Sequence, residues 1–193
     1  VSISCYLAPP HIDPHVVTVY WRDGFFEALS VDQAANSFSG IHTFATGGVF
    51  NIVVTVTDSD GAQSSGFVAT SYVTGVGVVD GTLFIVGTEE RDHVNVTTSK
   101  GSKNKPAELK VNAKLSQGAA QQHIKETFDP LTISRVVAFL CGGDDHYNGG
   151  GRGDAAADFR ISHLVFGGDG DDHLAGASWN DAIVGGAGHD DVF

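Results

Sequence analysis

The sequence predicts an all-β protein, and three features of the chain lead to this conclusion. Residues 49–57 form a run of β-branched and aromatic residues without proline or glycine, which is typical of a strand. Similar short runs recur through residue 139 and are separated by turn sequences such as Asp23-Gly24. Residues 140–193 repeat a pattern rich in glycine and aspartate every nine residues, which indicates stacked β-coils.

The composition limits the classes of partner. The net charge is −12 at pH 7, and residues 140–193 contribute −8 of it through ten Asp and two Arg. Such a chain should repel nucleic acid and attract cations. No apolar run reaches about 18 residues, so we expect no membrane span. The chain contains no methionine, and Val1 to Pro10 lack the basic start of a signal peptide. We therefore expect a processed chain or a piece of a longer one, with any export signal outside it.

Residues 1–74 are predicted to form a β-sandwich. The clearest strands are residues 16–21 and 49–57, and the second ends in the turn sequence Asp58-Ser59-Asp60-Gly61. We expect Asp58 and Asp60 to shape this turn rather than bind metal. The predicted core includes the following four residues: Trp21, Phe44, Phe50 and Val54.

This segment resembles the PKD domain, an immunoglobulin-like sandwich of extracellular proteins. The resemblance covers about residues 12–73 and depends on Trp21-Arg22-Asp23-Gly24, His42-Thr43-Phe44, Gly47-Gly48 and the strand before Asp58. Arg22 stands where the family has a glycine. The resemblance implies an immunoglobulin-like fold for this part of the chain.

Residues 75–139 are predicted to be a β-rich connecting region. Strands are expected at residues 82–86, 94–97 and 108–111, with a basic hairpin loop at 100–106. We expect that loop to be solvated rather than an anion site. Residues 87–95 keep the Gly, Asp and apolar positions of the later repeat but lack the glycines that open its loop, so we interpret them as at best a degenerate copy. The sequence leaves two arrangements open for residues 75–139, extra coils stacked on the repeats or a separate sheet.

From Leu140 onward the nine-residue pattern can be followed without a gap. Residues 167–175 and 185–193 fit Gly-Gly-x-Gly-x-Asp-x-U-x at every defined position, where U is a large apolar residue. The sixth position of successive repeats is Asp145, Asp154, His163, Asp172, Asp181 and Asp190. The eighth position is Tyr147, Ala156, Val165, Leu174, Ile183 and Val192. A Gly-rich acidic linker would have no reason to keep an apolar residue two places after each aspartate.

The chemistry of the repeat points to calcium. Ca²⁺ prefers six to eight oxygen ligands in flexible geometry. Glycine permits positive φ, which turns backbone carbonyls toward an ion, and the aspartate adds a charged oxygen. The pattern is similar to the RTX, or haemolysin-type, calcium-binding repeat. That resemblance implies a parallel β-roll with two repeats per coil.

Two repeats per coil predict two edges. One edge would stack Asp154, Asp172 and Asp190, and the other would stack Asp145, His163 and Asp181. We expect one or two ions, mainly on the first edge, because the loop before His163 lacks glycines. The predicted metal-site residues are Gly149, Gly150, Arg152, Asp154, Gly167, Gly168, Gly170, Asp172, Asp181, Gly185, Gly186, Gly188 and Asp190.

Three further features of the sequence are not interpreted as additional binding sites. We expect His163 to be a degenerate position rather than a metal ligand. The tripeptide Arg152-Gly153-Asp154 resembles an integrin-binding sequence, but its aspartate already belongs to the repeat. Cys5 and Cys141 are either a disulfide or two small buried side chains.

The sequence therefore predicts a calcium-binding module with no catalytic residues of its own. It contains no His-Glu-x-x-His, no Gly-x-Ser-x-Gly and no phosphate loop. The resemblances imply a secreted or cell-surface bacterial structural or adhesion protein, with surface proteins or carbohydrate as partners of the parent. The alternative is the export and folding module of a larger toxin or hydrolase.

Overall fold

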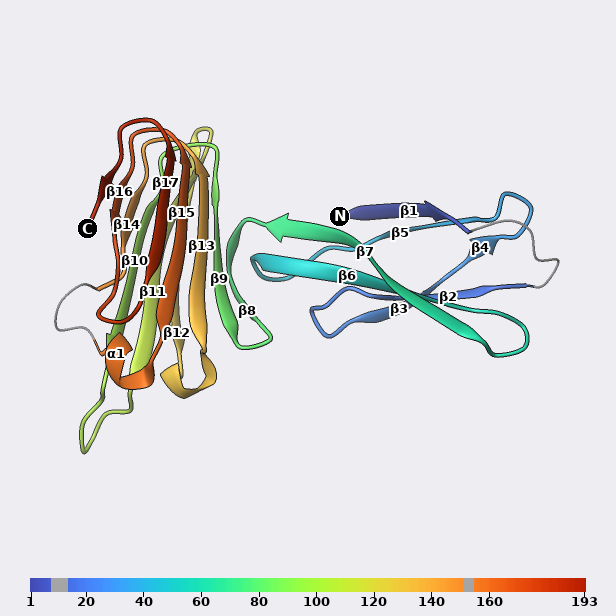
Figure 1. Cartoon of the computed structure of the whole chain (residues 1–193), viewed down its shortest axis with the longest axis horizontal. Coiled ribbons are helices and arrows are strands. Elements are labelled where there is room, and N and C mark those ends of the chain that lie inside the picture. Colours follow the sequence, from blue (N-terminus) through green and yellow to red (C-terminus); the bar gives the residue numbers. More distant parts are fainter. Residues whose placement is uncertain (8–13, 151–154) are drawn as a thin grey trace. The chain divides into compact units, whose positions relative to one another are not determined.

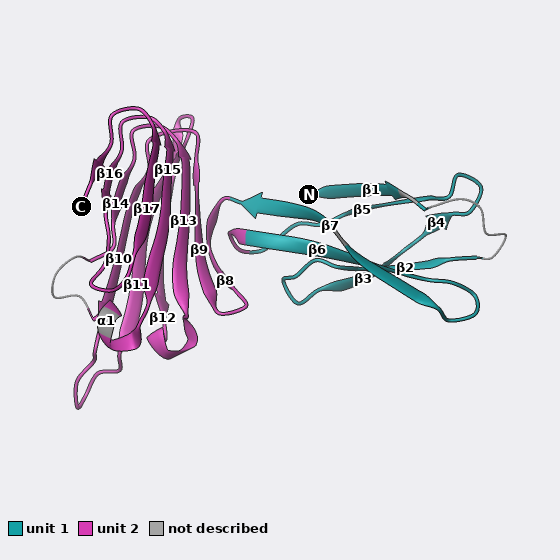
Figure 2. Ribbon diagram, viewed as in Figure 1, with its two compact units in different colours: residues 1–45, 49–73 teal, residues 46–48, 74–193 magenta. Residues whose placement is uncertain are grey.

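The computed structural model describes residues 1–7, 14–150 and 155–193 and is all-β (Figure 1). The chain forms two compact units (Figure 2). The first contains Val1–Ala45 and Val49–Val73, and the second contains Thr46–Gly48 and Thr74–Phe193. No helix within the described ranges has the length and apolarity needed to cross a membrane.

The first unit consists of two sheets. One has the strand order β1-β5-β4 and the other the order β3-β2-β6-β7. Strand β2 pairs antiparallel with both β3 and β6. The strands are β1 (Ser2–Tyr6), β2 (Val16–Tyr20), β3 (Phe26–Leu29), β4 (Val31–Asp32), β5 (Ser37–Ile41), β6 (Gly48–Thr57) and β7 (Gln63–Val73).

Both sheets of the first unit contribute to one core. Strand alternation directs Ile3 and Phe38 from one sheet, and Val17 and Ile52 from the other, into the same cluster. Of the four residues predicted for this core, Trp21, Phe50 and Val54 are buried, while Phe44 is half-buried and stacks on Phe50 at 4.1 Å between ring centroids.

The predicted turns of the first unit are present. Asp58 Oδ1 accepts hydrogen bonds from the backbone N–H groups of Asp60 and Ala62, at 3.0 and 2.8 Å. Arg22 has a φ of 70°, a left-handed conformation that favours glycine. This explains why a glycine would suit the position after Trp21.

The second unit also consists of two sheets. Their orders are β17-β15-β13-β9-β8 and β12-β11-β10-β14-β16-β18. Two short helical segments, η1 (Pro130–Thr132) and α1 (Ala156–Phe159), lie between strands. The strands are β8 (Gly75–Val79), β9 (Thr82–Thr88), β10 (His93–Ser99), β11 (Glu108–Gln117), β12 (Ala120–Phe128), β13 (Arg135–Gly142), β14 (His146–Asn148), β15 (Ser162–Asp169), β16 (His173–Ala175), β17 (Ala182–Ala187) and β18 (Asp191–Val192).

Four pairs of strands in this unit repeat one arrangement. In β9–β10, β13–β14, β15–β16 and β17–β18, the first strand lies in the five-stranded sheet and the second in the six-stranded sheet. Neighbouring strands of successive pairs run parallel. We call each pair a rung and number the rungs one to four along the chain.

Both sheets of the second unit also bury one continuous core. Leu83, Val136 and Val165 enter it from the five-stranded sheet, and Val94 and Leu174 from the six-stranded sheet. Residues 75–139 and 140–193, whose relation the sequence left open, thus share a single core. The hairpin β11–β12 lies at the outer side of rung one and supplies further core residues, Leu109 and Leu115.

Candidate metal centre

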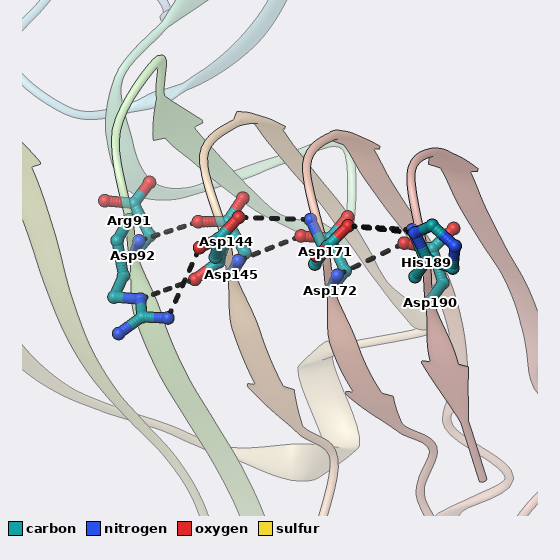
Figure 3. A network of polar contacts seen from close by, with 8 residues as sticks. All are labelled: Arg91, Asp92, Asp144, Asp145, Asp171, Asp172, His189 and Asp190. Carbon is teal, nitrogen blue, oxygen red and sulfur yellow. Dashed lines mark hydrogen bonds and ion pairs between the residues drawn. The ribbon is translucent and has the colours of Figure 1, made fainter.

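A row of four aspartates lies where each rung passes from its first strand to its second. The backbone N–H of Asp92 donates to Asp145 Oδ1 at 2.7 Å, and that of Asp145 donates to Asp172 Oδ1 at 2.9 Å. The N–H of Asp172 donates to Asp190 Oδ1 at 3.2 Å (Figure 3). We call this row the aspartate edge. It places one carboxylate on each rung and connects every rung to the next.

The residues of the aspartate edge differ from the predicted set. Asp145 was expected beside His163 and Asp181, but it stacks between Asp92 and Asp172. The prediction was wrong because it assumed 18 residues per coil throughout. The spacing is 53 residues from Asp92 to Asp145, 27 from Asp145 to Asp172 and 18 only in the last step.

Two carboxylate oxygens of this edge are buried without a partner. They are Oδ2 of Asp145 and Oδ2 of Asp172, and both residues are only 2% exposed to solvent. Burial, together with the carboxylates of Asp92 and Asp172, raises the pKa of Asp145 to about 8, against the backbone hydrogen bond from Asp92. Burial, aided by Asp190, also raises the pKa of Asp172. Ionised carboxylates are therefore disfavoured at this edge unless a cation compensates their charge, and without one the edge tends to hold protons instead.

The glycines of the loops bring main-chain oxygens close to these carboxylates. A Cβ at Gly167 would overlap Asp172 Oδ2 and lie 2.5 Å from the carbonyl oxygen of Gly185 on the next rung. Only glycine therefore leaves room for the carboxylate at this position. The φ angles of Gly168 and Gly186 are 119° and 127°, values that other residues rarely adopt.

The first rung satisfies its aspartate with protein donors instead. Asp92 Oδ2 accepts the backbone N–H of Thr88 at 2.7 Å, and Oδ1 accepts the N–H of Ser116 at 2.8 Å. The hydroxyl of Thr88 lies 3.1 Å from Oδ1. Asp92 is fully buried, and its burial raises its pKa although these hydrogen bonds lower it. No oxygen of Asp92 is left for a cation.

The opposite edge of the rungs contains Asp181 and His163. Asp181 Oδ1 accepts the N–H of His163 at 2.7 Å, and Oδ2 accepts the N–H of Ala177 at 2.6 Å. Both carboxylate oxygens are thus occupied. His163 is buried, its Nδ1 pairs with the Tyr147 hydroxyl at 2.9 Å, and burial lowers its pKa to about 4 against the effect of Asp181.

Two further predicted ligands, Gly149 and Gly150, do not reach the aspartate edge. The N–H of Gly149 donates to the carbonyl of Ala175 at 2.8 Å, and a Cβ at Gly149 would meet the backbone of Gly176. Gly149 and the adjoining Gly150 therefore belong to the opposite edge. Arg152 and Asp154 lie outside the described residues. The structure brings together Gly167, Gly168, Gly170, Asp172, Gly185, Gly186, Gly188 and Asp190.

The sequence prediction also missed two members of the edge, Asp92 and Asp145. Both stand at the sixth position of a nine-residue unit, residues 87–95 and 140–148. The degenerate copy at 87–95 is in fact rung one, because Val94 pairs with Tyr147 and Thr88 with Cys141. Following that copy in register would have found Asp92 from the sequence alone.

The donor set fits a hard cation. In the described part of the chain, no three His, Cys, Asp or Glu side chains form a preformed metal cluster. A calcium ion, however, takes backbone carbonyls as readily as carboxylates. The edge offers both kinds of oxygen, with the free Oδ2 of Asp145 and Asp172 among glycine loops. Zinc or another soft ion would find no nitrogen or sulfur ligand among these oxygens.

Both cysteines are free and half-buried, so they do not form a disulfide. Cys141 occupies the place of Gly168 and Gly186 in the strand register and has a φ of 79°. Its loop is thus a modified form of the glycine loop.

Comparison with known proteins found no matching family model, no matching curated protein and no matching solved structure.

Proposed function

We propose that the second unit binds calcium along the aspartate edge and that the ions stabilise the stacked rungs as a parallel β-roll. One observation carries the proposal: Oδ2 of Asp145 and Oδ2 of Asp172 are buried, charged at neutral pH only at a cost, and without a partner. Calcium would supply the missing charge. The parent would then be a secreted or cell-surface structural or adhesion protein.

The proposed ligands come from neighbouring rungs. Asp145, Asp172 and Asp190 would supply carboxylate oxygens, and the loops containing Gly143, Gly167 and Gly185 would supply carbonyls. We place one ion between rungs two and three and another between rungs three and four. Rung one needs no ion, because Thr88 and Ser116 already satisfy Asp92.

The first unit would serve as a separate, calcium-independent module with an immunoglobulin-like fold. Its two sheets share a core, and its acidic turn at Asp58 is satisfied by backbone N–H groups. A module of this kind fits a role in spacing or adhesion at a cell surface. The alternative function, an export and folding module of a larger toxin or hydrolase, would use the same calcium sites.

Hydrogen exchange of the full chain, with excess EDTA and with millimolar calcium, tests the proposal. Ions bound only by the folded form should stabilise it by about 2.7 kcal/mol at a hundredfold excess over Kd. Amides of β13 to β18 should therefore exchange much more slowly with calcium, while those of β2 and β6 should not change. Equal exchange of β13 to β18 in the two conditions would refute calcium binding at this edge.

A further inference from the structure

A row of three histidines lies on the outer face of the six-stranded sheet. His93, His146 and His173 stand directly across from each other in the parallel register of β10, β14 and β16. Their rings are stacked, with centroids 4.5 Å apart for His93 and His146 and 5.0 Å apart for His146 and His173. Each histidine comes directly after an aspartate of the edge, so its side chain points to the other face of the strand.

These histidines line an open pocket of about 300 Å³ together with acidic residues. The full lining is Arg91, Asp92, His93, Asp144, Asp145, His146, Asp171 and His173. The position two residues before each histidine is also on the outer side, and this row contains Arg91, Asp144 and Asp171 (Figure 3). The pocket therefore places imidazole nitrogens beside carboxylates, outside the core.

The two ends of the row differ in charge. At rung one, the guanidinium of Arg91 contacts Asp144. Its Nε donates to the Asp144 carbonyl oxygen at 2.8 Å, and a terminal nitrogen lies 3.6 Å from Asp144 Oδ2. A cation would be repelled there. At rungs two and three, the Asp171 side chain is 65% exposed; its Oδ1 accepts the N–H of His189 at 2.8 Å, which leaves Oδ2 for a cation. His146 Nδ1 is buried with no hydrogen-bond partner.

We propose that His146 and His173, with the carboxylate of Asp171, bind a transition-metal ion such as Zn²⁺ in this pocket. Imidazole suits Zn²⁺, Cu²⁺ and Ni²⁺, whereas Ca²⁺ prefers oxygen alone. The site would be distinct from the oxygens of the aspartate edge. The two rings are stacked in the metal-free structure, so His173, whose side chain is 48% exposed, must rotate to turn a nitrogen toward the ion.

Zinc titration of the full chain by calorimetry, in excess calcium, tests this site. Excess calcium competes for the oxygen ligands of the aspartate edge, so zinc that still binds is expected at histidines, and the variants identify which ones. The variants His146→Phe and His173→Phe keep an aromatic ring in the stack but remove both nitrogens. We expect one zinc ion per wild-type chain and at least a tenfold loss of affinity in each variant. His123→Phe, on β12, is the matched control and should bind zinc as the wild type does.

Two results would overturn the proposal. One is zinc binding that is unchanged in both His146→Phe and His173→Phe. The other is zinc binding that disappears when calcium is added, which would place the ion on the aspartate edge. Thermal unfolding in calcium shows whether each variant is folded. NMR of the wild type gives an independent readout, because zinc should shift or broaden the imidazole Cε1–H signals of His146 and His173. Zinc binding that persists while calcium protection is absent would refute the calcium proposal alone.

Discussion

The backbone N–H of Asp145 donates to Oδ1 of Asp172, which lies 27 residues further along the chain, at a distance of 2.9 Å. A coil of two nine-residue repeats would separate these two aspartates by 18 residues. The observed separation is longer by one further repeat. The extra residues include α1 and lie between β14 and β15. As a result, Asp145 joins Asp172 and Asp190 on one edge, where two repeats per coil would have placed Asp154.

Replacing Asp172 should weaken calcium binding much more than replacing Asp181. Both residues hold the sixth position of a repeat. Asp172 has an unpartnered Oδ2, whereas both oxygens of Asp181 accept backbone hydrogen bonds. We expect Asp172→Ala to raise the calcium Kd at least tenfold, about 1.4 kcal/mol, and Asp181→Ala to change it by less than about threefold. Calorimetric titration of the two variants measures the difference.

Asp181→Ala should instead lower the stability of the fold with or without calcium, because the N–H groups of His163 and Ala177 lose their acceptor. The expected cost is about 1 to 3 kcal/mol. Equal losses of calcium affinity in the two variants would mean that Asp181 is itself a ligand.

Calcium-free protein should lose stability as the pH rises from 6.5 to 8. The pKa of Asp145 is raised to about 8 in the folded chain, so the folded state keeps a proton that the unfolded state has released. Such a group destabilises the fold progressively as pH rises toward its folded pKa, by up to about 1.4 kcal/mol per pH unit. Above pH 6.5 the low pKa of His163, about 4, has little influence, because its unfolded form is then largely neutral too.

Urea unfolding in EDTA across this pH range measures the effect. Asp145→Asn is the control, since it carries no titrating proton, and its stability should vary less with pH. Bound calcium should also reduce the pH dependence of the wild type. A wild-type stability that is constant or rises between pH 6.5 and 8 would contradict the expectation.

Thr88→Val should destabilise the second unit without changing its calcium affinity. The Thr88 hydroxyl lies 3.1 Å from Asp92 Oδ1 and 3.3 Å from Oδ2, and valine removes it while keeping the shape. The loss should be about 1 to 2 kcal/mol. Chemical unfolding gives the stability, and calorimetry gives the Kd for calcium. A weaker Kd in this variant would show that rung one takes part in an ion site.

The first unit should melt at the same temperature in calcium and in EDTA. Asp58→Ala removes the acceptor of two backbone N–H groups in the turn after β6, so we expect a loss of about 1 to 2 kcal/mol in either condition. Calorimetric melting of the full chain resolves this transition if the two units unfold separately. A calcium-dependent shift in the melting temperature of the first unit would identify Asp58 or Asp60 as ligands.

Much of the fold could be predicted from local sequence patterns. The β-branched run at residues 49–57 is β6 (Gly48–Thr57), and the predicted strand at 94–97 lies within β10 (His93–Ser99). The loops at 167–172 and 185–190 are adjacent because 18 residues separate them, as two repeats per coil require. These features depend on residues that are close in sequence or related by a constant period.

The rest depends on insertions that a period does not record. The hairpin β11–β12 and segment η1 extend the first coil to 53 residues, and the segment before β15 extends the second to 27. Each insertion changes which aspartates meet, although the local pattern is unaltered. Ser116 could not be identified as a partner of Asp92 because it lies 24 residues away on the inserted hairpin.

The two corners of the rungs also differ in how they tolerate changes in length. At the aspartate edge every loop has the same length, since Asp92, Asp145, Asp172 and Asp190 each lie five residues after the start of their nine-residue unit. All of the additional chain enters at the other corner, after β10 and after β14. Foreign peptides could therefore be displayed there, for example in the hairpin loop between β10 and β11, without altering the spacing of the carboxylates. The scaffold separates a corner of constant length from one that is free to diversify.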